Sequence, residues 1–261
     1  MTRKQVVKEI SRCEKNREFD KHVDPVNYDI VIKVDKDYHY YKKGFERVKY
    51  ALENIFIVKP YTRWINRCKC HTKVIGKENL KGIGAAVLTC NHVYMFDCLV
   101  VKGTVGEDLF ITAAPFNNQK GFLGEMMRAG GMMPMSDDKS GMKSFINAVN
   151  RRLCDGKKVL FYPEQAMWWM YRKPRPLKDG AFHFAVKNGV PLIPCFITFT
   201  GNGTYDGEGI ENNDFTLNIG KPIYAPESLS SKEKAEYLKV KNFEEWKKTY
   251  ENFYGKELSY D

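Results

Sequence analysis

Four apolar runs separated by helical segments constrain the fold of this 261-residue chain more than any other feature. Each run is nearly continuous in apolar residues, which is typical of strands buried on both faces of a parallel sheet. The runs occupy residues 84–90, 108–114, 157–162 and 191–199, and predicted helices occupy residues 118–129, 140–154 and 179–188 between them. The sequence therefore predicts an α/β fold, with a mainly parallel or mixed central sheet flanked by helices.

The chain before this region predicts a basic, aromatic and partly helical N-terminal segment, residues 1–71. A short strand is expected at residues 28–34. A helix is expected to begin near Phe45 and to end at Pro60, because proline disfavours a helical conformation in the residue before it. Aromatic and cationic residues in one helix suit docking on an anionic membrane. A helix packed on its own domain with a solvated basic face explains the same composition, and the sequence leaves both interpretations open.

The predicted core spans residues 72–228 and includes a late strand at residues 215–219. Residues 229–261 predict an amphipathic helix packed on that core. Its aromatic side chains recur at helical spacing, at Phe243, Trp246, Tyr250 and Phe253. The sequence thus predicts helical appendages at both ends of the α/β core.

The net charge of +10 favours an anionic partner. Nucleic acid is not expected, because the chain has no recognisable nucleic-acid-binding motif. No apolar stretch reaches membrane-spanning length and no signal peptide is visible, so we expect a cytoplasmic protein. The seven cysteines are expected to be reduced thiols. Cys68-Lys69-Cys70-His71 lacks the spacing of a zinc site, so no metal is expected.

The strongest chemical signal is His92, which follows the first apolar run and precedes Asp97 by five residues. A histidine can accept a proton at neutral pH, and a carboxylate beside it can orient the ring. Residues five apart diverge on a helix and on a strand, so the two side chains can meet only across a turn. A histidine that ends a strand and an aspartate that caps a helix would account for the same residues without catalysis.

A second signal follows the run at residues 157–162, where Tyr162-Pro163-Glu164-Gln165 places an acid at the end of a predicted strand. Cationic side chains come next, at Arg172, Lys173, Arg175 and Lys178. They are suited to binding a phosphate, although an exposed basic loop is the commoner origin of such a cluster.

Taken in order, these blocks resemble the glycerolipid acyltransferase family, that of the bacterial 1-acylglycerol-3-phosphate acyltransferases. The similarity covers residues 72–225. It rests on four motifs, which are Asn91-His92-x4-Asp97, the glycine-containing segment 130–134, Phe161-Tyr162-Pro163-Glu164 and the segment 189–194.

The resemblance implies acyl transfer from acyl-CoA or acyl-carrier protein to a hydroxyl of a lysophospholipid or related glycerolipid. The acyl donor is then a substrate, and no bound cofactor is expected. His92 corresponds to the general base, Asp97 to the carboxylate that orients it, and Glu164 to a glutamate of the acceptor-binding block. A Ser-type nucleophile elbow is absent, and a cysteine acyl-enzyme at Cys90 or Cys98 is a minor alternative.

The chain departs from the family at two of these blocks. Gln165-Ala166-Met167-Trp168 stands where the family usually has Gly-Thr-Arg-Ser, so the arginine expected to hold the acceptor's phosphate is missing. Lys139 is the cation that remains after the glycine-containing segment. The predicted acceptor-binding residues are therefore Glu164, Lys139, Arg172, Lys173 and Arg175.

The altered glutamate block motivates a rival hypothesis, a catalytically silent lipid- or membrane-binding protein on the same scaffold. Under either hypothesis the sequence predicts peripheral contact with the inner face of the cell membrane. The docking candidates are the helix within residues 38–67 and the loop that carries Trp168 and Trp169.

Overall fold

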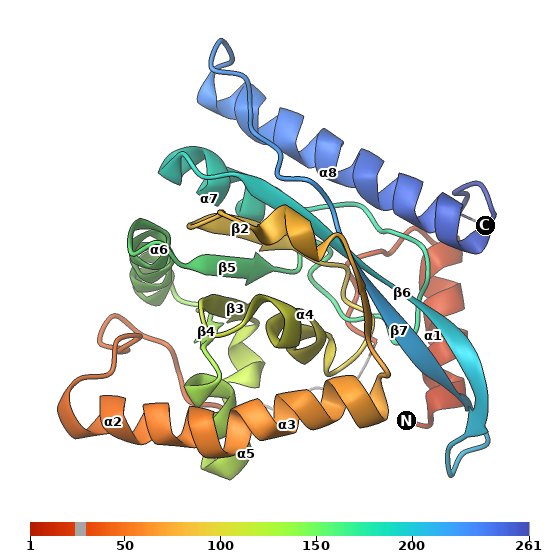
Figure 1. Cartoon of the computed structure of the whole chain (residues 1–261), viewed down its shortest axis with the longest axis horizontal. Coiled ribbons are helices and arrows are strands. Elements are labelled where there is room, and N and C mark those ends of the chain that lie inside the picture. Colours follow the sequence, from red (N-terminus) through yellow and green to blue (C-terminus); the bar gives the residue numbers. More distant parts are fainter. Residues whose placement is uncertain (24–29, 261) are drawn as a thin grey trace.

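The computed structural model describes residues 1–23 and 30–260, and these form a seven-stranded mixed sheet covered by helices (Figure 1). The strands are β1 (Lys73–Ile75), β2 (Ala86–Thr89), β3 (Leu109–Ala113), β4 (Met132–Pro134), β5 (Lys158–Phe161), β6 (Leu192–Tyr205) and β7 (Glu211–Ile219). Their order across the sheet is β1-β7-β6-β2-β5-β3-β4. The β6–β7 pair is antiparallel and the other neighbouring pairs are parallel.

The predicted α/β fold is confirmed, because all four apolar runs form neighbouring parallel strands. The connecting helices are α4 (Asp97–Val105), α5 (Gly121–Ala129), α6 (Lys139–Cys154) and α7 (Gly180–Asn188), and α8 (Ser231–Tyr254) comes last. Two short 3-10 helices, η3 (Lys77–Leu80) and η4 (Pro115–Asn117), lie in the loops. The sequence did not predict β1 and β4, which have three residues each.

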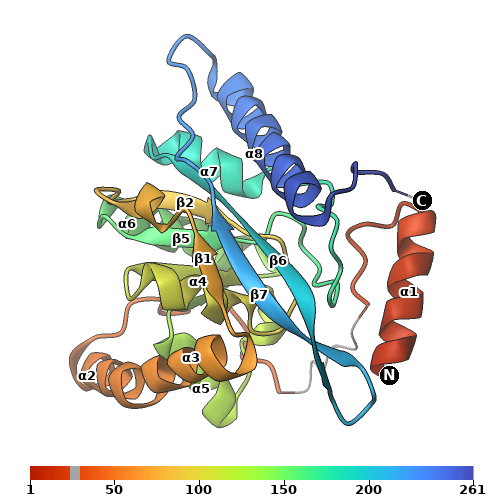
Figure 2. The same cartoon turned by 45° about the vertical axis from the view of Figure 1, so that its right-hand side comes forward.

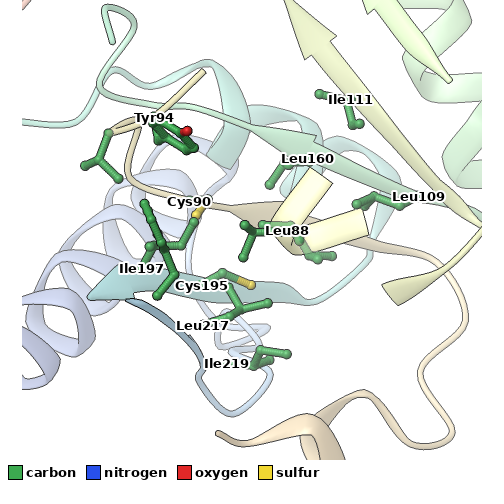
Figure 3. Packing of buried hydrophobic residues seen from close by; sticks show 14 of the residues in the cluster. Leu88, Cys90, Tyr94, Leu109, Ile111, Leu160, Cys195, Ile197, Leu217 and Ile219 are labelled. Atoms are coloured by element: carbon green, nitrogen blue, oxygen red, sulfur yellow. The ribbon is translucent and has the colours of Figure 1, made fainter. Parts of the chain in front are cut away.

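Alternating side chains of the buried strands build a core on each face of the sheet. On β2, Leu88 belongs to a cluster on the α4 side, whereas Val87 belongs to a cluster with residues of α6, α7 and α8. Figure 3 shows part of the first cluster, in which Leu88 lies among Leu160, Cys195 and other side chains of the strands. These two cores hold the ends of β2 and β5 in fixed positions.

A long helical segment runs below the sheet in Figure 1 and consists of α2 (Gly44–Glu53), η1 (Asn54–Val58), α3 (Lys59–Trp64) and η2 (Ile65–Lys69). The prediction that Pro60 ends this helix is wrong. Both η1 and η2 are π-helical, and the N–H of Lys59 closes a wide turn on the carbonyl of Asn54 immediately before the proline. A wide turn accommodates the missing donor and the ring of proline, so the helix continues.

The strand predicted at residues 28–34 is wrong in its described part, where Val31 forms only an isolated bridge with Gln119. Residues 28 and 29 lie outside the described residues. The first helix, α1 (Arg3–Lys15), lies beside the C-terminal end of the chain (Figure 2). Phe19, just after α1, packs edge-on against Tyr260 with ring centroids 4.9 Å apart. Within the described residues, no helix is both long enough and apolar enough to cross a membrane.

Candidate active site

The two chemical signals of the sequence meet at one edge of the sheet, because β2 and β5 are parallel neighbours. Thr89 at the end of β2 lies opposite Phe161 at the end of β5. The chain leaves β2 toward His92 and leaves β5 toward Glu164. The carboxyl edge of a parallel sheet is where loops commonly assemble a site.

His92 and Asp97 are in direct contact, with the ring Nδ1 of His92 2.7 Å from Oδ2 of Asp97. The turn that joins them is closed by the N–H of Asp97 on the carbonyl of Tyr94, and α4 begins at Asp97. The same carboxylate oxygen accepts the N–H groups of Val93 at 3.1 Å and Tyr94 at 3.3 Å. A carboxylate on Nδ1 favours the tautomer that leaves Nε2 free to accept a proton.

The pair differs in exposure in a way that suits its geometry. Asp97 has a side chain only 1% exposed, whereas that of His92 is 23% exposed. The carboxylate is therefore fixed inside the protein, and the imidazole reaches the surface of the site.

Tyr162 is a further member of this cluster that the sequence reasoning did not single out. Its hydroxyl donates to Oδ1 of Asp97 at 2.7 Å. Its ring stacks on the imidazole of His92, with centroids 4.1 Å apart and planes inclined by 24°. Burial, reinforced by the charge of Asp97, raises the pKa of Tyr162 well above its ordinary value. The signal in the sequence was an aromatic residue directly before Pro163-Glu164 at the end of β5.

Glu164 is turned into the protein and ties the two loops together. Its Oε2 accepts the backbone N–H of His92 at 3.0 Å and a guanidinium N–H of Arg175 at 2.8 Å. Its Oε1 accepts the backbone N–H of Arg175 at 2.8 Å. Both oxygens of the predicted acceptor-binding carboxylate therefore have partners inside the chain, and one of them fixes the backbone at the candidate base.

Arg175 is equally internal. Its side chain is 1% exposed, and the guanidinium also donates to the carbonyls of Phe19 at 2.9 Å and Ala166 at 2.5 Å. It lies over the ring of Trp168, 4.6 Å from the centroid. The structure thus places Arg175 behind the site, where it pairs with Glu164 and does not face an incoming phosphate.

The remaining predicted acceptor-binding cations are spread over the surface. Lys173 pairs with Glu14 of α1 at 2.6 Å. The exposed Arg172 lies over the ring of Tyr254 at 5.3 Å. Lys139 is exposed at the start of α6, after β4, which is three strands from β2 and hence about 14 Å away. No printed contact joins any of these three to His92 within the described residues.

The loop predicted to insert Trp168 into a membrane has a different role, and that prediction is wrong for Trp168. This side chain is fully buried, and its indole N–H donates to the carbonyl of Lys21 at 2.9 Å. It packs in a small cluster with Val6 and Ile10 of α1. The reason is tertiary, because α1 covers the loop from outside.

The cysteines that flank the pair are poor nucleophiles in this environment. Burial raises the pKa of Cys98 to about 12 and raises that of Cys90 well above its ordinary value. Both thiols are therefore protonated at neutral pH, and the thiolate is the nucleophilic form. Among the residues that the structure describes, no three His, Cys, Asp or Glu side chains form a group suited to a metal ion.

Comparisons with known proteins agree with this arrangement. A family model described as acyltransferase matches residues 71–198, which contain both loops of the site. A 1-acyl-sn-glycerol-3-phosphate acyltransferase of Saccharomyces cerevisiae is 26% identical over 181 residues, which are 62% of this chain and 57% of the yeast protein. The chain belongs to the glycerolipid acyltransferase family.

A solved member of the glycerolipid acyltransferase family shares the fold. The crystal structure of the 1-acyl-sn-glycerophosphate (LPA) acyltransferase from Thermotoga maritima matches with a TM-score of 0.56 and 18% identity. The match covers 84% of this chain and 87% of that protein.

The departure from the family after Glu164 is accommodated in the backbone. Gln165 stands where the family usually has glycine, and it adopts φ of +66°, in the left-handed region that glycine enters freely. The turn is therefore retained without glycine. The family's arginine position is not replaced locally, because Ala166 and Trp168 are buried beneath α1.

Proposed function

We propose that the chain transfers a fatty acyl group from acyl-CoA or acyl-carrier protein to a hydroxyl of a lysophospholipid or related glycerolipid. The observation that carries the proposal is the contact between His92 and the buried Asp97, which leaves Nε2 of the ring as the proton acceptor. This arrangement lies in the segment that matches the acyltransferase family.

In the proposed mechanism, Nε2 of His92 takes the proton of the acceptor hydroxyl while its oxygen attacks the thioester carbonyl. Collapse of the tetrahedral intermediate breaks the C–S bond, and the departing thiolate receives the proton from the imidazolium. Asp97 orients the ring and offsets its positive charge. General-base assistance of this kind contributes about 10²–10⁴-fold to the rate.

Acceptor recognition falls to the exposed cations in this proposal. Lys139 and Arg172 are exposed and remain candidates for the acceptor's phosphate. Lys173 is already paired with Glu14, and Glu164 and Arg175 hold each other. The conserved role of the glutamate block in this chain is then to hold the His92 loop.

The long helix from α2 to η2 supports docking on a membrane. Its apolar side chains are exposed, with Phe45 at 83% and Phe56 at 71%, and α2 buries no residue. Phe122 and Leu123 at the start of the neighbouring α5 are exposed as well. Contiguous exposed apolar surface marks an interaction site.

Cationic residues accompany the apolar side chains along this helix. Arg47, Arg63 and Arg67 have no ion pair within the described residues, so their charge is available to anionic headgroups. We therefore assign the helix from α2 to η2 to peripheral contact with an anionic membrane surface on the cytoplasmic side. That location would bring the site to acceptors that reside in the bilayer.

The catalytic proposal is tested by measuring CoA release from palmitoyl-CoA with a panel of lysophospholipids on vesicles. His92→Ala should lower turnover by about 10²–10⁴-fold, whereas the exposed His183→Ala serves as a matched control and should retain wild-type turnover. Unchanged turnover in His92→Ala refutes the base assignment. A wild-type protein that binds the vesicles but releases no CoA with any acceptor supports the silent lipid-binding alternative.

The docking proposal is tested separately by sedimentation with vesicles that contain phosphatidylglycerol. The double variant Phe45→Asp/Phe56→Asp should remain in the supernatant, because it places two charges in the apolar face. Tyr224→Asp is the control, since Tyr224 is 63% exposed outside this helix. Equal sedimentation of the double variant and the wild type contradicts the assignment.

A further inference from the structure

We propose that Tyr162 is a positioning residue for the His92–Asp97 pair, its hydroxyl fixing the carboxylate while its ring fixes the imidazole. The inference rests on the proposed function and adds a third side chain to it. Two independent contacts support it, the 2.7 Å hydrogen bond to Oδ1 of Asp97 and the 4.1 Å stack on the ring of His92.

The two oxygens of Asp97 are not equivalent. Oδ2 accepts from His92 and from the backbone N–H groups of Val93 and Tyr94, so three donors hold it. Oδ1 accepts the hydroxyl of Tyr162, its one partner among the described residues. Since Asp97 is 1% exposed, water cannot replace that hydroxyl without a rearrangement. The phenol therefore prevents rotation of the carboxylate away from the imidazole.

The phenol can fill this role because it stays protonated. Burial and the charge of Asp97 raise the pKa of Tyr162 well above its ordinary value, so the hydroxyl is a donor throughout the neutral range. The other titratable groups around it do not compete. Cys90 and Cys98 have raised pKa values and remain neutral, and Glu164 is paired with Arg175.

The hydroxyl also moderates the charge that the carboxylate presents to the imidazole. A donor on Oδ1 withdraws negative charge from the group that stabilises the imidazolium. Loss of the hydroxyl should therefore favour the imidazolium form. The catalytic base would then be occupied by a proton over a wider pH range, and the acidic limb of the activity profile should move to higher pH.

Tyr162→Phe separates these effects, because it retains the stacked ring and removes the hydroxyl. Turnover of palmitoyl-CoA with the lysophospholipid panel should fall about tenfold in kcat, the equivalent of one hydrogen bond to a charged group. KM should stay within about twofold, because Tyr162 is not assigned to the acceptor. The acidic limb of log kcat/KM should rise by about half a pH unit to one unit.

The matched control is Tyr40→Phe, which removes a partly buried hydroxyl that donates to the carbonyl of Pro134 at 2.7 Å away from the pair. This variant should leave kcat and the pH profile unchanged. In the Asp97→Asn background, Tyr162→Phe should cause little further loss, since both changes act on the same contact. NMR titration of the His92 imidazole follows the same shift without turnover.

A Tyr162→Phe enzyme with wild-type kcat, pH profile and imidazole titration overturns the inference. A loss that adds fully to that of Asp97→Asn overturns it as well. Failure of the proposed function itself gives a different result, because His92→Ala would then retain turnover. The two failures are therefore distinguishable in one set of variants.

Discussion

Replacing Arg175 by methionine removes the positive partner of a fully buried carboxylate. Glu164 and Arg175 have side chains that are each 1% exposed, and a guanidinium nitrogen lies 2.8 Å from Oε2 of Glu164. The substitution also deprives the carbonyls of Phe19 and Ala166 of a donor. Methionine approximates the length of the arginine stem, so charge and hydrogen bonding are lost more than volume.

The expected loss is about 3–5 kcal/mol in the free energy of unfolding, the usual consequence of leaving a buried charge without its partner. With an m-value of about 3 kcal/mol/M, the urea midpoint should fall by about 1–1.7 M. Tryptophan fluorescence is a suitable probe, because Arg175 lies over the ring of Trp168. Adding Glu164→Gln to Arg175→Met should restore part of the loss, since the unpaired charge is then removed.

Lys178→Met provides the matched control. Lys178 pairs with Asp20 at the same distance, 2.8 Å, but both side chains are about half exposed, at 51% and 54%. An exposed pair contributes at most about 1 kcal/mol. If Arg175→Met and Lys178→Met shift the midpoint equally, burial does not give the Glu164–Arg175 pair its importance, and the reasoning about the glutamate block fails.

Three further predictions follow from burial and backbone geometry. Iodoacetamide at pH 8 should label the exposed Cys68 well before Cys98, whose pKa is raised to about 12 by burial, and mass spectrometry after timed quenching would show the opposite order if Cys98 were an activated nucleophile. Gln165→Gly should stabilise the fold by about 0.5–1 kcal/mol in urea unfolding, because φ of +66° strains a residue with a side chain; a destabilised variant would show that the glutamine side chain makes a compensating contact. Trp246→Ala should cost about 3–5 kcal/mol, since its 1% exposed ring anchors α8 on Phe196, and a change below about 1 kcal/mol in thermal or urea unfolding would contradict that packing.

The central sheet was predictable because its strands carry a strong local signal. Every described residue of β2 is buried, so its sequence is continuously apolar or nearly so. By contrast, all three residues of β1 are exposed, and the strand exists because β7 offers a free edge. Pairing with a distant strand leaves no periodicity in so short a segment. The helix through Pro60 was missed for a related reason, since the π-helical turn before it has no simple sequence signature.

The candidate site divides along the same line between local and distant contacts. The contact of His92 with Asp97 is local, because a single turn over five residues brings the side chains together. The contact of Tyr162 with Asp97 joins residues 65 positions apart and requires knowing that β2 and β5 are neighbours. The sequence indicated that Tyr162 and Glu164 end a strand. It could not show that Glu164 would meet Arg175 and the His92 backbone in preference to an acceptor.

The altered block after Glu164 acquires a physical explanation from α1. Ala166 and Trp168 are both fully buried, and they share a small apolar cluster with Val6, Ile10 and Cys13 of α1. A polar Thr-Arg-Ser sequence in this segment would place an arginine beneath that helix, at the cost of burying its charge. The apolar residues found here are therefore those that coverage by α1 requires. The same coverage orders the carbonyl of Phe19, which receives a hydrogen bond from Arg175, and Arg175 in turn holds Glu164 against the backbone of His92. An unbroken series of contacts thus joins the first helix to the candidate base, which explains how a chain that lacks the family's arginine still builds a fixed His92 loop.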